Sequence, residues 1–155
     1  MKHFYILLTG LAVMLFMHAC DWANEIDDRT PFLGIYEVEE IQYNHATLDF
    51  DTTYYEMEIT MEETEDVVLN GLGSSGVYST GCTITATVGG LRLVIPNNLC
   101  DFGNGVYYEF TGSGTLDDNH QELVISLDPR RCQQQSNSVD DCRDEQAVSI
   151  HATKQ

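Results

Sequence analysis

The five cysteines carry the clearest chemical signal in this chain of 155 residues. Cys20 follows a basic start at Lys2 and an apolar segment over residues 4–17, and residues 21–28 turn abruptly polar. The apolar segment is shorter than the roughly 20 residues that a membrane helix needs, and its basic start is typical of a secretory signal. We therefore expect residues 1–19 to be a signal peptide that is removed on export.

Ala19-Cys20 resembles the cleavage site of bacterial lipoproteins, in which the cysteine is acylated and becomes the first residue of the mature chain. Met17 and His18 differ from the residues usual in that motif, and an ordinary signal cleavage is the alternative. Each buried acyl methylene contributes about 0.8 kcal/mol, so two or more acyl chains anchor a protein stably. The resemblance implies lipidation of Cys20. The acidic residues that follow, with little apolar content among them, predict a flexible tether over residues 20–31.

The other four cysteines form an even set, which in an exported chain predicts two disulfides. Three pairings are open. We expect the pairing of sequence neighbours, Cys82 with Cys100 and Cys132 with Cys142. Zinc is the alternative for four cysteines, but the sequence lacks the Cys-x-x-Cys spacing that is typical of zinc sites.

Two further patterns bear on catalysis and cofactor binding. Residues 71–76 spell the Gly-x-Gly-x-x-Gly fingerprint of dinucleotide sites, but such a site needs a helix behind the glycines, and the sequence there favours strands. The histidines of the mature chain are scattered over different predicted turns and strands: His45, His120 and His151. We therefore expect no enzyme and no cofactor, with a hydrolase built from distant residues as a lesser alternative.

Acidic residues dominate the charge balance, with 25 Asp and Glu against 7 Lys and Arg. The net charge of −18 becomes −19 once Lys2 leaves with the signal peptide. Nucleic acid is not an expected partner, because its binding draws on Lys and Arg. No metal site is expected either, since the acidic loop from Asp49 has Tyr54 and Thr60 where a calcium loop needs Gly and Glu. We expect the acids to be solvated surface charge.

From Phe32 onward, apolar residues do not recur at helical spacing for three turns, and alternation of apolar and polar residues is frequent, which predicts strands rather than helices. Tyr36 and Val38 share one face of the first strand. Ile41 and Tyr43 would lie on that same face only if Glu39 and Glu40 formed a bulge. The expected strands cover residues 34–44, 52–62, 66–70, 83–88, 91–95, 106–111, 122–127 and 146–153.

Two turn signals define the central hairpin. Gly89-Gly90 predicts a tight turn, which would place Cys82 opposite Asn97 and leave Cys100 three residues past the ladder. Pro96 is expected to end the returning strand, because proline cannot donate a ladder hydrogen bond.

Short turns between these strands favour sequential antiparallel neighbours. About eight such strands are expected to close into a single up-and-down β-barrel over residues 32–155, because closure removes exposed sheet edges. A β-sandwich is the alternative fold. An immunoglobulin-like sandwich would be expected to bury a tryptophan, whereas Trp22 lies in the tether.

Short motifs along this body carry a resemblance. They are Phe32-x-Gly34-x-Tyr36-x-Val38, Asn70-Gly71 followed by residues 83–96, residues 112–116 and residues 152–154. Together they resemble small lipoproteins of Bacteroidetes-type bacteria with a lipocalin-like, or calycin-like, β-barrel. The resemblance implies an outer-membrane lipoprotein of the cell envelope, facing the periplasm or the cell surface. It implies no particular ligand.

The interior of the predicted barrel is the remaining candidate site. Eight strands enclose a space that side chains fill or that holds one small ligand. The large residues expected to point into it are Tyr36, Tyr55, Met57, Tyr108 and Phe110. We expect a binding protein for a small apolar ligand inside, or for an envelope protein or glycan held by its loops. A non-catalytic accessory subunit of an envelope complex is the alternative.

Overall fold

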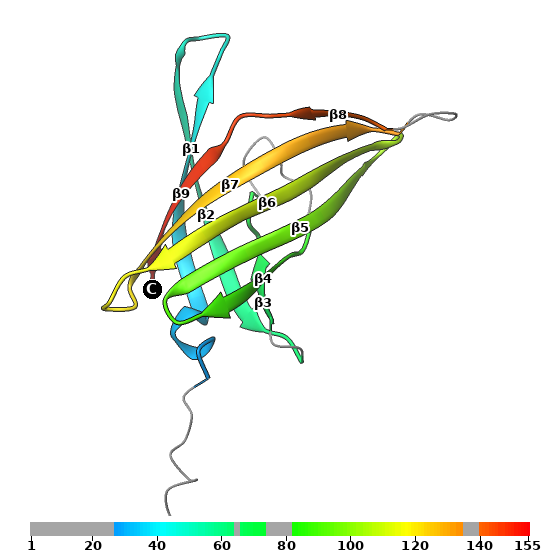
Figure 1. The fold of residues 1–155 in the computed structure, drawn as a ribbon. Coiled ribbons are helices and arrows are strands. Elements are labelled where there is room, and N and C mark those ends of the chain that lie inside the picture. Colours follow the sequence, from blue (N-terminus) through cyan, green and yellow to red (C-terminus); the bar gives the residue numbers. More distant parts are fainter. Residues whose placement is uncertain (1–26, 64–65, 74–81, 135–139) are drawn as a thin grey trace, which may run out of the picture.

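The computed structural model describes residues 27–63, 66–73, 82–134 and 140–155 (Figure 1). This part is all-β apart from one short 3-10 helix, and it contains no helix that is long and apolar enough to cross a membrane. The elements in chain order are η2 (Thr30–Phe32), β1 (Gly34–Asn44), β2 (Asp49–Met61), β3 (Asp66–Asn70), β4 (Ile84–Gly89), β5 (Arg92–Gly103), β6 (Val106–Leu116), β7 (Glu122–Gln133), β8 (Asp141–Asp144) and β9 (Val148–Lys154).

The strands close into an antiparallel barrel. Each of β1 to β6 pairs with the next strand along the chain, β7 pairs with β9, and β9 pairs back with β1. Eight strands thus form the wall, while β8 is an extra strand that pairs with β7 beyond the end of β9. This topology confirms the predicted up-and-down barrel, is consistent with a lipocalin-like one and excludes the sandwich.

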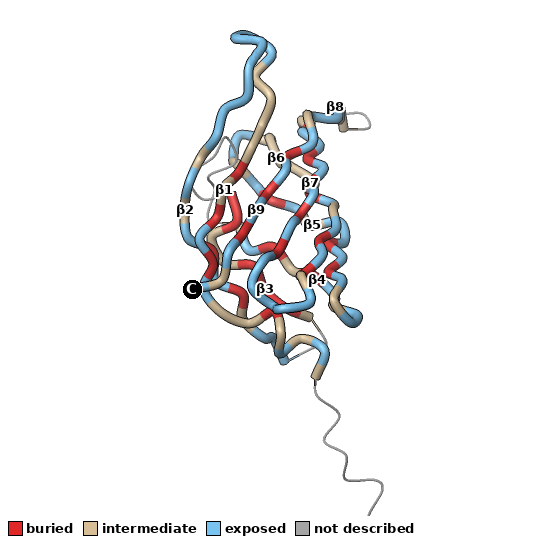
Figure 2. Tube along the Cα trace, turned by 90° about the vertical axis from the view of Figure 1, so that its left-hand side faces the viewer, coloured by how far each residue is buried: buried red, intermediate tan, exposed pale blue. Residues whose placement is uncertain are grey.

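Buried and exposed residues alternate along the strands of the wall (Figure 2), and the buried side chains form one core inside the barrel. In β7, Leu123, Ile125 and Leu127 are buried and the residues between them are exposed, as expected for a strand with one wet face. Where the chain enters the barrel, the 3-10 helix buries Phe32, whose carbonyl accepts a hydrogen bond from the Tyr36 hydroxyl at 2.8 Å. This helix closes one end of the barrel.

Pro96 does not end its strand, contrary to our expectation, and β5 continues to Gly103. The β5–β6 register shifts between Ile95 and Asn98, so Pro96 lies in a bulge. The Asn98 side chain takes over pairing with β4. Its Nδ2 donates to the Thr85 carbonyl and its Oδ1 accepts from the Thr85 N–H, both at 3.0 Å. A side-chain amide thus replaces ladder bonds at the proline.

β7 likewise continues past Pro129, beyond its predicted end. Its first half pairs with β9 as far as Leu127, and its second half pairs with β8 from Arg130 onward. The Pro129 carbonyl accepts a hydrogen bond from the Glu145 N–H at 2.9 Å. Because the N–H and C=O of a strand residue point to the same side, the N–H that proline lacks would have pointed at the junction between these two ladders. β8 is a strand that the residue pattern does not predict, because its four residues are mostly polar.

Both disulfides join the expected pairs: Cys82–Cys100 and Cys132–Cys142. The β4–β5 turn lies one residue later than predicted, since Gly89 pairs with Arg92. Together with the extra residue of the bulge at Pro96, that register brings Cys100 beside Cys82, with their Cα atoms 5.6 Å apart, instead of three residues past the ladder. The bulge therefore aligns the two sulfur atoms for bonding.

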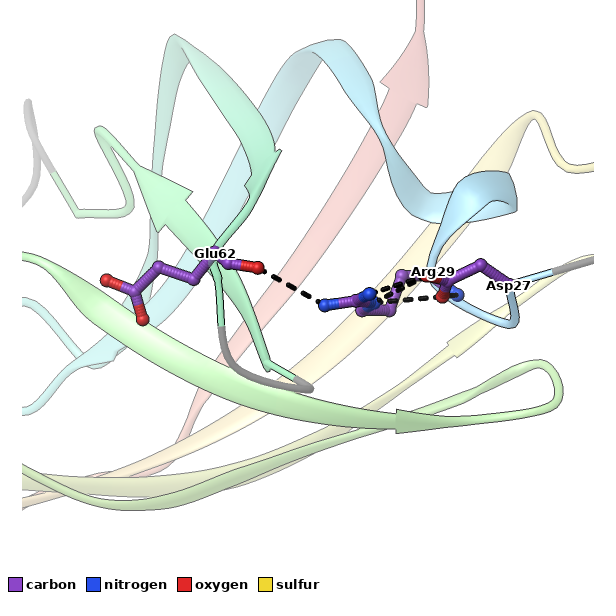
Figure 3. A network of polar contacts seen from close by, with 3 residues as sticks. All are labelled: Asp27, Arg29 and Glu62. Atoms are coloured by element: carbon purple, nitrogen blue, oxygen red, sulfur yellow. Dashed lines mark hydrogen bonds and ion pairs between the residues drawn. The ribbon is translucent and has the colours of Figure 1, made fainter.

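The chain is packed onto the barrel from Asp27, so residues 27–31 are not the free tether that we expected. Arg29 forms an ion pair with Asp27, and its Nη1 donates to the Glu62 carbonyl at 3.3 Å (Figure 3). The hydrogen bonds from Arg29 lower the pKa of Asp27 to about 2. Asp28 accepts a bond from the Gly90 N–H at 3.0 Å. The predicted signal peptide and lipidation site lie outside the described residues.

Candidate functional site

The residues predicted to line the interior are brought together, and most of them fill it. Tyr36, Met57 and Phe110 are buried members of one continuous core. The Tyr36 hydroxyl is bonded to the Phe32 carbonyl, and burial, followed by the charge of Asp117, raises the pKa of Tyr36 to about 12. A ligand at this level would have to displace packed side chains, and ligand binding by these residues stays a prediction.

The other two predicted residues, Tyr55 and Tyr108, are half-buried. The Tyr55 hydroxyl donates to Glu40 Oε2 at 2.7 Å and accepts from the Gly73 N–H at 3.0 Å. Burial and then the charge of Glu40 raise the pKa of Tyr55. The Tyr108 ring packs against Phe102, with ring centroids 4.7 Å apart. Tyr55 therefore ties the chain after β3 to the wall, and Tyr108 extends the aromatic core.

Glu40 is a buried carboxyl group that our sequence-based expectations missed; only 3% of its surface is exposed. Removal from water raises its pKa above the ordinary value of 4.5, and the hydrogen bond from Tyr55 opposes that rise. No bulge forms at Glu39 and Glu40, because β1 and β2 pair in one unbroken register. Strict alternation from Val38 turns Glu40 inward, and this alternation is the signal that could have revealed it.

A hollow of about 550 Å³ lies on the outer face of the barrel, across β1, β2 and β9. We call it the outer groove. Because β1 lies between the other two strands, its outward glutamates are flanked on both sides. The strand register sets the side chains of the outer groove in two rows, Thr153–Glu37–Glu56 and His151–Glu39–Tyr54.

The outer groove is acidic. Three of its side chains are carboxylates, and no lysine or arginine is among the described residues that line it. The Gln155 side-chain nitrogen donates to both Glu37 Oε1, at 3.5 Å, and Glu56 Oε1, at 3.4 Å. One nitrogen donor group thus fits between two carboxylates. A protonated amine or a guanidinium in that place would form charge-assisted hydrogen bonds.

Aromatic residues extend the outer groove along the β1–β2 hairpin. Tyr54 is 70% exposed, and its hydroxyl donates to Glu39 Oε1 at 3.0 Å, which raises the pKa of Tyr54. Phe50 is 64% exposed and packs edge-on against Tyr43, which lies opposite it. Exposed rings beside carboxylates can contact both the apolar stem and the charged head of a lysine or arginine.

The β1–β2 hairpin projects beyond the barrel wall (Figures 1 and 2). Its own polar groups hold the turn. Asn44 Oδ1 accepts from the Ala46 N–H at 2.9 Å, and Asn44 Nδ2 donates to Asp51 at 2.7 Å. Leu48 takes a left-handed conformation, with φ of 58°, and its N–H donates to the Asn44 carbonyl at 2.8 Å. The tip therefore presents an apolar side chain, 75% exposed, on a defined turn.

A second hollow, of about 510 Å³, lies where β5 ends and β6 begins. Tyr107 donates to Asp140 there at 2.7 Å. Glu109, which also lines it, groups with the sulfur atoms of Cys132 and Cys142. These sulfurs form a disulfide and are not the thiolates that bind metals. The cluster therefore does not supply a metal site.

The histidines considered for catalysis lie apart. His45 contacts Tyr43 at the hairpin, His120 lies between β6 and β7, and His151 lines the outer groove. Of the Gly-x-Gly-x-x-Gly pattern, the first two glycines lie in the turn after β3, and the third lies outside the described residues. Within the described part, the histidines therefore do not share one catalytic site.

Comparison with protein-family models, with curated proteins and with solved structures finds no match for this chain. The barrel and the outer groove are therefore the basis for a functional inference.

Proposed function

We propose that this protein is a lipid-anchored binding protein of the bacterial envelope that holds a cationic partner in the outer groove. One observation carries the proposal: three carboxylates and an exposed tyrosine share a hollow in which no described lysine or arginine neutralises them. The carboxylates attract and orient a positive group, and the Tyr54 ring gives that group a surface to pack on.

The charge of the whole chain favours such a partner. The net charge is −18, or −19 without the signal peptide. A field of that sign raises the local concentration of cations and speeds association with a basic partner. Further outward carboxylates flank the outer groove, with Glu58 on β2 and Glu122 on β7. The outer groove thus lies within a larger surface of the same sign.

The position of the hairpin suits an anchored protein. The chain enters the barrel through the 3-10 helix at one end, and the β1–β2 hairpin projects from the other (Figure 1). Anchoring through Cys20 would point the hairpin away from the membrane, where a macromolecule has access. The two disulfides support an oxidising compartment outside the cytoplasm. The proposed location is the outer membrane, on its periplasmic face or at the cell surface.

A small apolar ligand inside the barrel has less support, because the large inward residues pack into a continuous core. The second candidate function is a non-catalytic accessory subunit of an envelope complex. The same groove favours it, since a basic surface of a neighbouring subunit would fit there. The two candidates differ in whether the partner is exchanged or permanent.

Calorimetric titration of the mature protein with an oligolysine of about ten residues tests the proposal. The groove variant combines Glu37→Gln, Glu39→Gln and Glu56→Gln. At low salt we expect it to bind about tenfold more weakly, because three surface charge pairs, each contributing about 0.2 to 1 kcal/mol, sum to about 0.6 to 3 kcal/mol, a range that brackets the 1.4 kcal/mol of one decade.

A matched control removes the same charge at exposed positions elsewhere: Glu62→Gln, Asp118→Asn and Asp128→Asn. These changes keep the outer groove intact. We expect the control variant to retain most of the parent affinity. Equal losses in the two variants would show diffuse attraction without a site and would contradict the proposal.

A further inference from the structure

β2 is paired unequally on its two sides. β1 pairs with it continuously from Asp49 to Ile59, whereas β3 pairs with its other side only from Glu58 to Met61. Within the described residues, no strand pairs with that other side between Asp49 and Met57. We call this stretch of backbone the β2 edge. It belongs to the hairpin that projects from the barrel (Figure 1).

Among the residues that the structure describes, none forms a ladder with the β2 edge on the side away from β1, so its backbone groups are open to another strand there. In an antiparallel ladder, alternate residues turn their N–H and C=O groups to opposite sides, so every second residue here directs both groups away from β1. Proteins commonly block such an edge with a proline, a lysine or a bulge. Residues 49–57 contain no proline and no lysine, and the β1–β2 register shows no bulge. Asp49 and Asp51 are charged, but they repel only partners of their own sign.

We infer that the β2 edge binds an extended cationic segment of a partner protein as an additional strand. This inference rests on the proposed function, because it specifies how the cationic partner is held. Main-chain hydrogen bonds supply affinity in this mode, and side chains at alternate positions supply specificity. The added strand would extend the sheet that β9, β1 and β2 form, next to the outer groove.

The outward residues of the β2 edge indicate which side chains the added strand carries. Phe50, Tyr54 and Glu56 alternate with inward residues and so share the outer face. Side chains on a neighbouring strand lie about 5 Å from those opposite them. Lysine or arginine at alternate positions would meet the carboxylate of Glu56 and the exposed rings of Phe50 and Tyr54. The preferred segment is therefore basic at every second residue.

Charge complementarity selects a basic segment over a second copy of this chain. The β2 edge carries Asp49, Asp51 and Glu56 and no basic residue. Two copies pairing edge to edge would bring these carboxylates of both chains into one sheet, and like charges on neighbouring strands are destabilising. A basic segment places opposite charges in the same positions.

Three forms of one peptide test the inference on the mature protein. The peptide alternates lysine and valine over about ten residues; one form is unmodified, one is N-methylated on its valines and one on its lysines. An added strand bonds to β2 through only one of the peptide's two edges, and the valine and lysine N–H groups lie on opposite edges. One methylated form should therefore bind about tenfold more weakly or worse, and the other should bind like the unmodified peptide. The unmodified peptide should also slow hydrogen exchange at amides of the β2 edge about tenfold.

The outcomes separate this inference from the proposed function. Equal binding of the three forms, with unchanged exchange at the β2 edge, would overturn strand addition, and the proposed function would stand if the groove variant still weakened binding. No binding of any form would overturn both. A dimer that forms with increasing concentration, with its β2 edge protected and no peptide present, would assign the edge to a second copy and overturn the inference.

Discussion

Glu40 lies inside an otherwise apolar barrel, where its ionisation has to be accommodated. Burial raises its pKa, so the folded chain holds this proton more tightly than the unfolded chain. The stability gained is fully present below the ordinary pKa of 4.5 and is lost as the pH rises through the raised value. Glu40→Gln keeps an acceptor for Tyr55 and removes the charge. We expect it to be more stable than the parent by about 1 to 3 kcal/mol at about pH 8 and nearly equal at about pH 4.

Thermal unfolding followed by circular dichroism across this pH range checks the Glu40 prediction. Glu58→Gln is the control, because Glu58 is exposed on the outer face of the same pair of strands. The control should leave the pH dependence unchanged. A Glu40→Gln variant that tracks the parent at both ends of the range would show that the buried carboxylate ionises without cost.

Asn98 replaces backbone pairing with a side chain, so its removal affects more than its own contacts. Asn98→Ala leaves the N–H and the carbonyl of Thr85 without the partner that each has in the folded chain. A buried or half-buried unpaired polar group costs about 1 to 3 kcal/mol. We expect a loss of about 2 kcal/mol or more in urea unfolding. Asn97→Ala, at an exposed neighbouring position, should cost less than about 0.5 kcal/mol, and similar losses would refute this role.

Among the elements, alternation predicts which segments are strands better than it predicts where they end. β1 and β3 have the predicted bounds, residues 34–44 and 66–70. β5 and β7 run beyond their predicted ends because Pro96 lies in a bulge and Pro129 lies between two ladders. Both features depend on a partner strand, which the local sequence does not show. β8 depends on β7 in the same way.

The two disulfides hold elements of different importance. Cys132–Cys142 joins β8 to β7 outside the closed wall, whereas Cys82–Cys100 joins the chain just before β4 to β5, a strand of that wall. Each disulfide restricts the unfolded chain, so its removal should lower the free energy of unfolding by about 3 kcal/mol. We expect Cys132→Ser with Cys142→Ser to unprotect the β8 amides in hydrogen exchange while the barrel amides stay protected.

The matched control is the other pair, Cys82→Ser with Cys100→Ser. It should lower protection in β4 and β5, because it loosens the wall itself. Loss of protection throughout the barrel in the Cys132 and Cys142 double variant would contradict the peripheral role of β8.

The outer groove could be predicted only in part. Alternation alone puts Tyr54 and Glu56 on the outward face of their strand. Their meeting with Glu37, Glu39 and His151 depends on the register of two ladders, one of which joins the first strand to the last. The alternation pattern also favoured a site inside the barrel. The interior is filled by the same large residues that suggested a pocket, so the available surface is the outer one.

The molecule as a whole is a closed and filled barrel, so a partner would have to bind at its surface. One core cluster contains Phe32 of the 3-10 helix together with buried residues of the barrel strands. The charged residues are mostly acidic, with 25 Asp and Glu against 7 Lys and Arg. The ion pairs among the described residues involve three arginines, Arg29, Arg130 and Arg143, and at least one partner in each pair is exposed. Most carboxylates therefore repel one another across the surface.

This imbalance predicts how stability responds to salt. Raising NaCl from about 0.01 M to about 0.15 M shortens the screening length from about 30 Å to about 8 Å, which weakens repulsion between distant carboxylates more than it weakens the few close ion pairs. We expect the melting temperature to rise by about 3 °C or more, as about 1 kcal/mol of relieved repulsion implies.

Calcium chloride at the same ionic strength is the matched comparison for the salt experiment. Equal shifts with the two salts would mean that calcium acts by screening, as expected if the acids are solvated surface charge. A larger shift with calcium would instead reveal a specific site among them. A melting temperature that falls with NaCl would contradict the prediction, because it would mean that the ion pairs outweigh the repulsion. The field proposed to draw in a basic partner would then contribute less than the local contacts of the outer groove.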